Sequence, residues 1–296
     1  MKLEQKDTEL FYKLDWGLLF YVNQKANIIP HLKEPIFKKE KVEEVNKIQE
    51  KLAQNPSFID SFITENPSKL NEEELNIIKS WKKSIKSKFL VIKHSEQGTL
   101  FYDSFTEKKT YAVFGLYDDL ENIIPTECMP IMIQTTLLPF KGKIIYNGLF
   151  SHHNIAFGKS IRKSIELEFK ESKSRYGIIT SFDEPITERE DVDIELMKTY
   201  TQNREICYRY QSEINKLLKK NSSLEKVYYQ SLGKSEVRKF NKTLSALGVN
   251  PAYFAVFDDI IIASGQTEKE LRETVAKILP TEKQEYIYIF KFKGKK

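Results

Sequence analysis

The chain has 296 residues, of which 40% are hydrophobic and 12% aromatic, so it carries enough apolar material to form a buried core. This composition excludes a disordered chain, and the length allows two domains of ordinary size. The 47 basic and 42 acidic residues leave a net charge of +5, which permits a nucleic-acid partner but falls short of the strongly basic signature of such proteins.

Membrane, disulfide and zinc-binding classes are not indicated. The longest apolar runs, at 131–140 and 252–257, are shorter than the roughly 18 residues that span a bilayer. Acidic residues interrupt the first fifteen positions, unlike the apolar core of a secretory signal. Cys128 and Cys207 lie far apart without ligand spacing and are interpreted as ordinary small apolar side chains. We expect a cytoplasmic protein without a membrane partner, cofactor or metal.

Residues 1–88 are predicted to form a helical unit. Apolar residues at three- and four-residue spacing predict amphipathic helices over 10–29, 39–54 and 57–65. Asn71 and Glu74 have the spacing of a capping box, so a fourth helix is expected to begin there and end near Lys88. Its last turn would hold three cations favoured by the helix dipole, at Lys82, Lys83 and Lys86.

Residues 89–183 are predicted to form a β-rich unit, because the apolar pattern changes to the period of strands. Turn-rich segments separate the expected strands, which are 89–93, 99–103, 110–116, 131–138 and 143–147. The tight turn at 139–142 joins the last two into a hairpin. Five short strands in sequence indicate a small antiparallel β-barrel or a curved sheet. A long helix over 158–176 and a short strand over 177–182 follow.

The rest of the chain is predicted to form a helical connector over 184–248 and a ββαβ unit over 249–296. The connector would hold helices over 187–218 and 222–247. In the last unit a turn pair, Asp258-Asp259, separates two strands, and a helix capped by Thr267 and Glu270 precedes the third. The expected fold class is therefore α+β, and the first two units are expected to share a core.

Two segments have family resemblances. The block TLLPFKGKIIYNG at 136–148, with the passages around Trp81 and Phe89 and the segment Tyr176-Gly-Ile-Ile-Thr180, resembles a group of uncharacterised bacterial proteins. Some members of that group end in a Cys-rich zinc-binding tail of the SEC-C type, which this sequence lacks, so no partner recruited through that tail is implied. The segment 253–265 is similar to a second prokaryotic module of unknown function. These resemblances imply a fold and a bacterial origin, but no activity.

Basic residues gather where the helix over 158–176 is expected to begin. Lys159, Arg162 and Lys163 lie in its first turn, where the helix dipole disfavours cations. The triplet at 158–160 looks like the end of a phosphate-binding loop, but Asn154 replaces the required upstream glycine. A bound anion would resolve the electrostatic conflict, since free amides at a helix start bind phosphate.

Four further side chains add donors to this region, and we predict one anion-binding surface that contains Lys141, Lys143, His152, His153, Lys159, Arg162 and Lys163. The alternative is that Glu166 and acidic residues of other elements neutralise the cations and leave an ordinary solvated face.

Three functional interpretations follow. The first is a non-enzymatic accessory protein that binds nucleic acid or another polyanion. The second is an enzyme on a phosphate-containing substrate with His152 or His153 as general acid or base, although no ligand or nucleophile spacing accompanies them. The third is a purely structural or protein-binding component, and the apolar helix faces within 10–22 and 42–52 are either partner-binding faces or intramolecular core. Asp258 and Asp259 have the form of metal-binding polymerase aspartates, but they also suit a plain turn.

Overall fold

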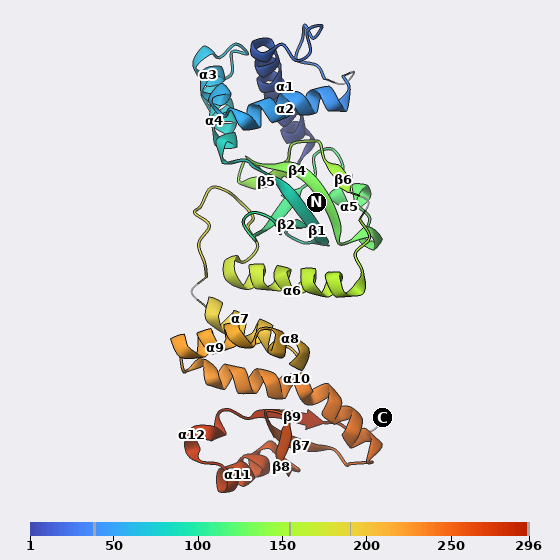
Figure 1. The fold of residues 1–296 in the computed structure, drawn as a ribbon, viewed down its shortest axis with the longest axis vertical. Helices are drawn as coiled ribbons and strands as arrows, with labels where there is room; N and C mark the ends of the chain where they lie inside the picture. The colour runs from blue at the N-terminus through green and yellow to red at the C-terminus, as the bar shows by residue number, and fades with distance from the viewer. Residues whose placement is uncertain (38–39, 154, 190, 295–296) are drawn as a thin grey trace. The chain divides into compact units, whose positions relative to one another are not determined.

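The computed structural model describes residues 1–37, 40–153, 155–189 and 191–294, except for the side chains of His152 and His153 (Figure 1). The chain divides into two compact units, Met1–Thr187 and Glu188–Lys296. Both contain helices and strands, so the mixed α and β class is confirmed. Within the described ranges no helix is long and apolar enough to cross a bilayer. The finer boundaries at 88, 183 and 248 stay predictions.

The first unit begins with four helices, α1 (Gln5–Ala26), α2 (Val42–Gln54), α3 (Ser57–Glu65) and α4 (Glu72–Ser80). The predicted capping box is confirmed, because the Asn71 side chain accepts a 3.0 Å bond from the Glu74 amide and the Glu74 carboxylate accepts one of 3.1 Å in return. The predicted end of this helix near Lys88 is wrong.

After α4 the chain makes one 3-10 turn, Trp81–Lys83, and enters strand β1 (Ile85–Ser95). Backbone pairing explains the early end of the helix, since β1 pairs with β4 (Ile131–Phe140) from Ile85 opposite Leu137 to Val91 opposite Ile131. Lys86 therefore belongs to a strand and not to a helix end.

Six strands form the sheet of this unit: β1, β2 (Gly98–Tyr102), β3 (Thr110–Phe114), β4, β5 (Lys143–Tyr146) and β6 (Ser151–His153). Their order is β1-β2-β3-β5-β4-β6, and β1 also pairs with β4. The prediction of a purely antiparallel arrangement is wrong, because β3 and β5 pair in parallel. The connection through α5 (Leu120–Ile123) reverses the chain before β4, so β5 returns along β3 in the same direction. The strand predicted over 177–182 is reduced to one bridge between Tyr111 and Ile179.

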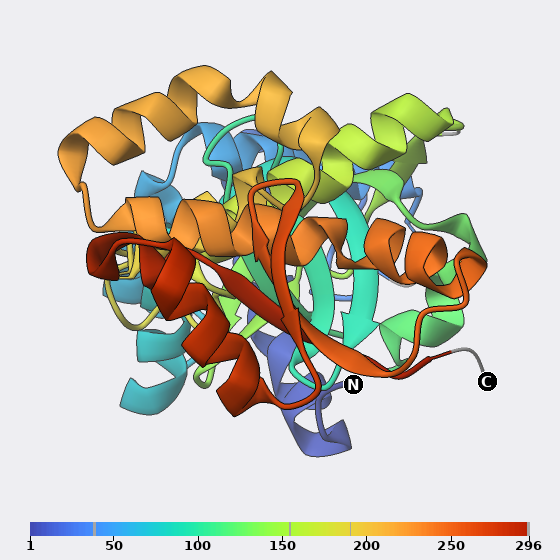
Figure 2. The same cartoon turned by 90° about the horizontal axis from the view of Figure 1, so that it is seen from below.

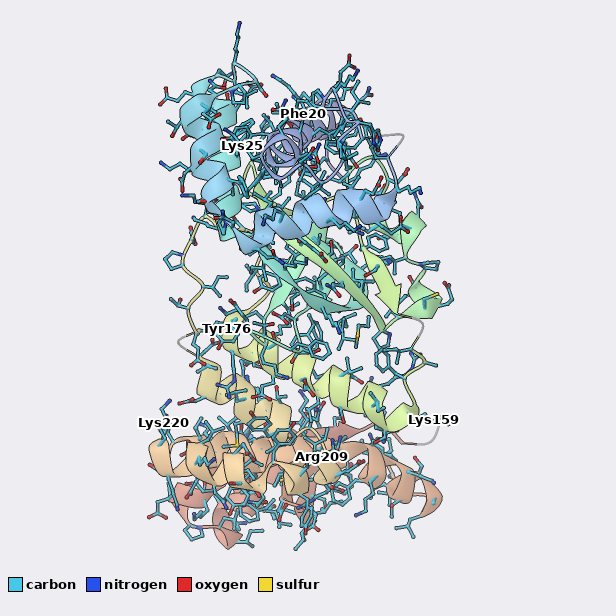
Figure 3. The ribbon with its side chains drawn as sticks, turned by 45° about the horizontal axis from the view of Figure 1, so that its top comes forward. Phe20, Lys25, Lys159, Tyr176, Arg209 and Lys220 are labelled. Atoms are coloured by element: carbon cyan, nitrogen blue, oxygen red, sulfur yellow. The ribbon has the colours of Figure 1, made fainter. Side chains whose placement is uncertain are left out.

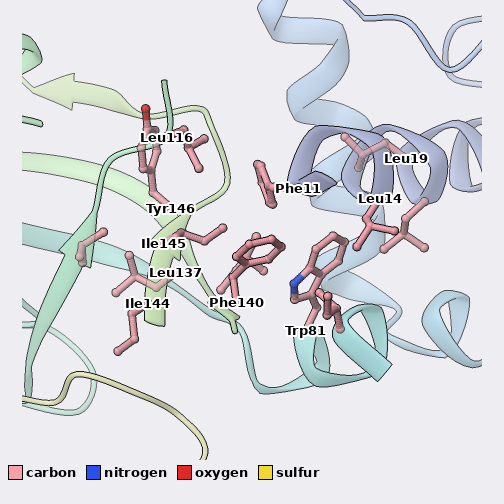
Figure 4. Packing of buried hydrophobic residues seen from close by; sticks show 14 of the residues in the cluster. Phe11, Leu14, Leu19, Trp81, Leu116, Leu137, Phe140, Ile144, Ile145 and Tyr146 are labelled. Carbon is pink, nitrogen blue, oxygen red and sulfur yellow. The ribbon is translucent and has the colours of Figure 1, made fainter. Parts of the chain in front are cut away.

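One core joins the helices to the sheet, as predicted. Its centre contains Phe11 of α1, whose ring lies edge-on to those of Trp81 and Phe140 at 5.9 and 6.0 Å between centroids (Figure 4). Trp81 Nε1 donates a 3.1 Å bond to the carbonyl of Pro139, so its polar atom is satisfied within the core.

Helix α6 (Lys159–Tyr176) covers the other side of the sheet, away from α1 to α4 (Figure 1). Its Ile165 and Phe169 pack against Leu90, Leu100 and Ala112, which lie on the outer face of β1, β2 and β3. Polar contacts add to this packing, because the Tyr102 hydroxyl donates to Glu168 at 3.1 Å. The outer face of these three strands is therefore occupied by α6.

The second unit starts with α7 (Val192–Tyr200), α8 (Arg204–Arg209), α9 (Gln211–Lys220) and α10 (Leu224–Ala246). The single helix predicted over 187–218 is wrong. The chain breaks after Tyr200 and starts again at Asn203, whose side chain accepts a 3.0 Å bond from the Ile206 amide and so caps α8. The second predicted helix corresponds to α10.

The predicted ββαβ order is confirmed by β7 (Ala252–Phe257), β8 (Ile260–Gly265), α11 (Glu268–Ile278) and β9 (Tyr288–Phe292), with a short α12 (Thr281–Gln284) before β9. The three strands form an antiparallel sheet in the order β8-β7-β9 (Figure 2). Alternate residues of β7 point to opposite faces, so Phe254 and Val256 pack towards α10 while Ala255 packs towards α11.

Candidate functional site

The two predicted hairpin lysines have partners within the first unit. Lys141 lies in the turn between β4 and β5 with a positive φ of 47°, and its Nζ is 2.8 Å from Oδ1 of Asp7. Lys143 places its Nζ 5.1 Å from the ring centroid of Phe114, a cation–π distance. Their charges are thus partly offset by intramolecular contacts.

The basic residues at the start of α6 are placed differently. The first turn contains no acidic residue, and Gly158 provides no side-chain cap. The Arg162 guanidinium nevertheless makes two hydrogen bonds to backbone carbonyl groups. Nε donates to the carbonyl oxygen of Phe157 at 2.9 Å, and Nη1 donates to the carbonyl oxygen of Met129 at 2.7 Å. Lys159 and Lys163 are exposed. Backbone carbonyls, and not carboxylates, therefore accommodate the arginine at this helix end.

The structure does not bring the hairpin lysines to the start of α6. Arg162 is bonded to Met129, just before β4 begins, whereas Lys141 directly follows the last residue of β4. A strand of this length spans about 30 Å, so the two groups lie at opposite ends of it. Figure 3 shows Lys159 at one end of α6.

The two histidines lie on β6, whose backbone pairs with β4 at Met132 and Ile133. Their side chains lie outside the described residues, so catalysis or anion binding by His152 and His153 stays a prediction. The seven predicted residues do not form one continuous basic surface, because Lys141 and Lys143 are separated from Arg162 by the length of β4.

The aspartate pair in the second unit forms the predicted turn. Asp258 has a positive φ of 57° between β7 and β8. Its carboxylate accepts a hydrogen bond from Arg204, whose Nε donates to Glu236 at 3.2 Å. The described residues contain no group of three or more His, Cys, Asp or Glu side chains placed to hold a metal ion.

A cavity of about 560 Å³ in the second unit is lined by several polar side chains that already have hydrogen-bond or ion-pair partners. Lys198 pairs with Glu195 at 2.8 Å, and the hydroxyls of Thr201 and Ser235 donate to helix carbonyls at 2.6 and 2.8 Å. These contacts reduce the hydrogen-bonding capacity of the cavity walls.

Two adjoining cavities under α2 form the best-developed candidate site, which we call the α2 groove. One has a volume of about 320 Å³ and the other about 230 Å³. They adjoin each other, because both are lined by Val42, Gln49, Asn147 and Leu149. Helix α1, helix α2, strand β4 and the segment that follows β5 therefore contribute to one site within the first unit.

The larger cavity is the polar end of the groove. Helical spacing places Asn46 and Gln49 of α2 in its wall, and β4 adds Gln134. Asn147 is fixed by two bonds, donating to Gln49 Oε1 at 2.7 Å and accepting from Thr135 at 3.1 Å. The side-chain amides of Asn46 and Gln134 have no partner in the described part of the chain, so they can bind a ligand.

The smaller cavity is the aromatic end of the groove, and Tyr12, Trp16 and Phe37 line it. The ring centroids of Tyr12 and Trp16 are 5.4 Å apart, and those of Trp16 and Phe37 are 6.4 Å apart. Position 148, beside these rings, favours glycine for two reasons. Its φ is 80°, which side-chain-bearing residues rarely adopt, and a Cβ there would lie 3.3 Å from the Tyr12 hydroxyl oxygen.

Asp15 supplies the single buried carboxyl group among the described residues of this aromatic end. Its residue is 7% exposed, and no hydrogen bond or ion pair reaches it from the described chain. Burial raises the pKa of Asp15 to about 7. The other carboxylate of the cavity, Glu40, lies 3.1 Å from Nε2 of His31 and so has a partner. Asp15 is therefore the group in the groove that most needs a ligand or a proton.

The groove has no motif in the amino-acid sequence that predicts it. One signal was available, since Asp15 follows Phe11 by four residues and precedes Leu19 by four, which places a carboxylate on the apolar face of α1. The amide side chains give no such signal, because they meet only through tertiary structure. Thr136, Asn147 and Gly148, at the two ends of the block 136–148, also line the groove.

No protein family model, curated protein or solved structure matches this chain, so the resemblances of 136–148 and 253–265 stay predictions.

Proposed function

We propose that the protein is a binding protein and that the α2 groove takes a small polar ligand. The observation that supports this most is the convergence of Asn46, Gln49 and Gln134 on a cavity that adjoins an aromatic pocket. Small-molecule sites combine apolar walls with a few polar groups and have volumes of roughly 300 to 1,000 Å³. The joined cavities fit that description.

Ligand screening with the full chain tests this proposal. The protein is incubated with a panel of small polar compounds and with an extract of host metabolites, and bound species are detected by thermal shift and native mass spectrometry. The variants Asn46→Leu and Gln134→Leu should weaken binding of any hit about tenfold each, because each removes one buried hydrogen bond.

Gln54→Leu is the matched control, because Gln54 is exposed at the end of the same helix and does not line the groove. It should bind the hit like the unchanged protein. Equal binding by all three variants, or no bound species in either assay, would contradict a ligand site in the groove.

Nucleic acid or another polyanion is the second candidate partner, because Lys159 is exposed in a first turn of α6 that contains no acidic residue. The strands pair in the order β1-β2-β3-β5-β4, and β4 also pairs with β1. We propose that these five strands form a small closed barrel of the OB type. Such barrels bind oligonucleotides on the face of their second and third strands. In this chain Phe169 of α6 packs on that face, so an oligonucleotide would need another surface.

The polyanion proposal is tested by the anisotropy of a labelled single-stranded oligonucleotide over a salt series. Binding through lysines should weaken steeply with salt, because counterions are released. Lys143→Gln and Lys159→Gln should each reduce the salt slope by about one. Binding that is absent at low salt, or unchanged in both variants, would exclude polyanion binding through these lysines.

A further inference from the structure

The chemistry of the aromatic end of the α2 groove narrows the class of ligand. An ionised carboxylate that is buried without a partner is strongly unfavourable, so it either takes up a proton or pairs with a cation. Asp15 is 7% exposed and has neither a hydrogen bond nor an ion pair in the described chain. A cationic ligand group would supply a partner for this carboxylate.

The walls around Asp15 suit an organic cation. Tyr12, Trp16 and Phe37 line the same cavity, and aromatic faces attract ammonium groups through their quadrupoles. The Tyr12 and Trp16 rings are tilted by 59° and the Trp16 and Phe37 rings by 60°, so the three do not stack flat against one another.

A metal ion suits the cavity less well. Divalent cations in proteins take several oxygen ligands, and the described residues contain no group of three or more metal-binding side chains. Glu40 is the other carboxylate of the cavity, and it is already held by His31. One carboxylate with aromatic neighbours recognises a single positive charge on a carbon skeleton.

We propose that the α2 groove selects a ligand with a protonated amino group, which pairs with Asp15 beside Tyr12 and Trp16. The neutral polar part of the same ligand lies against Asn46 and Gln134 at the other end of the groove. This inference rests on the proposed function, since it specifies the ligand of the same site.

A matched pair of probes tests the inference: 4-aminobutanamide and butanamide, which differ by the amino group. At pH 8 the amino compound should bind the full chain at least about tenfold more tightly in calorimetry, because of the charge-assisted bond. Asp15→Asn should abolish that difference and retain the weaker binding of butanamide. Glu40→Gln should preserve most of the difference, since Glu40 already has a partner.

A second readout is the proton released on binding. At pH 6.5 part of the Asp15 population is protonated, because burial raises its pKa to about 7. An ammonium ligand should displace that proton, which calorimetry detects as a dependence of the heat on the ionisation enthalpy of the buffer. Among the described residues, the other titratable groups at this cavity are Glu40, with its partner His31, and Tyr12. Asp15→Asn should remove the proton release.

The outcomes separate the two proposals. If butanamide binds and Gln134→Leu weakens it, but the amino group adds nothing, the amine inference is wrong and the polar groove stands. If the amino compound keeps its advantage in Asp15→Asn, the inference is also wrong. If neither probe binds and screening finds no other ligand, the function proposed for the groove fails as well.

Discussion

Arg162 Nη1 donates a 2.7 Å hydrogen bond to the carbonyl oxygen of Met129, and this contact joins the first turn of α6 to the segment before β4. Its Nε bonds to the carbonyl of Phe157. A cation at a helix start is disfavoured by the helix dipole, and here two carbonyl oxygens offset that cost. Arg162 therefore has a structural role that is independent of any anion.

Arg162→Gln should lower the free energy of unfolding by about 1 to 2 kcal/mol, because two carbonyls lose a charged donor. Lys159→Gln is the matched control from the same turn, and it should change stability by less than about 0.5 kcal/mol because Lys159 is exposed without a contact in the described chain. Urea unfolding measures both. Equal effects of the two substitutions would show that the carbonyl contacts are unimportant.

A second prediction concerns the pH dependence of stability. In the unfolded chain Asp15 ionises near its ordinary pKa of about 3.9, whereas burial raises the pKa to about 7 in the folded protein. Between these values folding takes up a proton, so the free energy of unfolding falls as the pH rises from about 4 to about 7. Over this pH range the free energy of unfolding should decrease by at most about 4 kcal/mol.

Asp15→Asn should remove this dependence. The difference in unfolding free energy between the variant and the unchanged protein should shift in favour of the variant across that pH range. Urea unfolding of both proteins at a series of pH values gives the difference directly, and other titrating groups cancel in it. A difference that is constant between pH 4 and pH 8 would contradict an unpartnered buried carboxyl group at position 15.

Local signals predicted many elements of the fold. The capping pair Asn71 and Glu74 located α4, and Thr267 located α11, because these signals act over three residues. Predictions failed where distant pairing decided the outcome. Ile85 continued an apolar helical pattern, yet it lies in β1 because Leu137 of β4 pairs with it. The parallel contact of β3 with β5 likewise depends on residues about thirty positions apart.

The candidate site was less accessible from the sequence than the fold. Asn46, Gln134 and Asn147 are ordinary polar residues in their own segments and become a site only when α2 lies across the strands. The predicted basic cluster assumed that residues near in sequence are near in space, but the ten residues of β4 separate Lys141 from Met129 and its partner Arg162.

The ion-pair network around Arg204 gives a third prediction. Arg204 bonds to Glu236, which is 8% exposed, and to Asp258 in the β7–β8 turn. Arg204→Gln should destabilise the second unit by about 1 to 3 kcal/mol, because a nearly buried carboxylate loses its main partner. Lys239, at 3.6 Å from Glu236, compensates in part.

Arg272→Gln is the control for this network, because Arg272 pairs with Glu268 one turn away on the exposed face of α11. Such exposed helix pairs contribute about 0.3 to 0.5 kcal/mol. Hydrogen exchange of the α8 and α10 amides should increase in Arg204→Gln and stay unchanged in Arg272→Gln. Similar exchange rates in the two variants would show that the Arg204 contacts do not stabilise the second unit.

The last prediction compares two glycines that lie inside helices. A Cβ added to Gly233 of α10 would lie 2.9 Å from the Cβ of Tyr288 and 3.5 Å from a methyl group of Val256, so α10 packs on the sheet at a glycine. A Cβ at Gly17 of α1 would meet only the Ser68 hydroxyl at 3.3 Å and Phe62 at 3.9 Å, and the hydroxyl can rotate away. Alanine gains about 1 kcal/mol over glycine in a helix, but overpacking costs about 1 to 3 kcal/mol.

Gly17→Ala should therefore leave the melting temperature unchanged or raise it. Gly233→Ala should lower the melting temperature, because the added methyl group would collide with the Cβ of Tyr288, which cannot rotate away. Helix α10 could then accommodate the methyl group only by moving away from β9. Thermal unfolding of the two variants, followed by near-ultraviolet circular dichroism, measures this contrast within one protein. A stabilised Gly233→Ala variant would mean that α10 does not approach β9 as closely as the 2.9 Å contact requires.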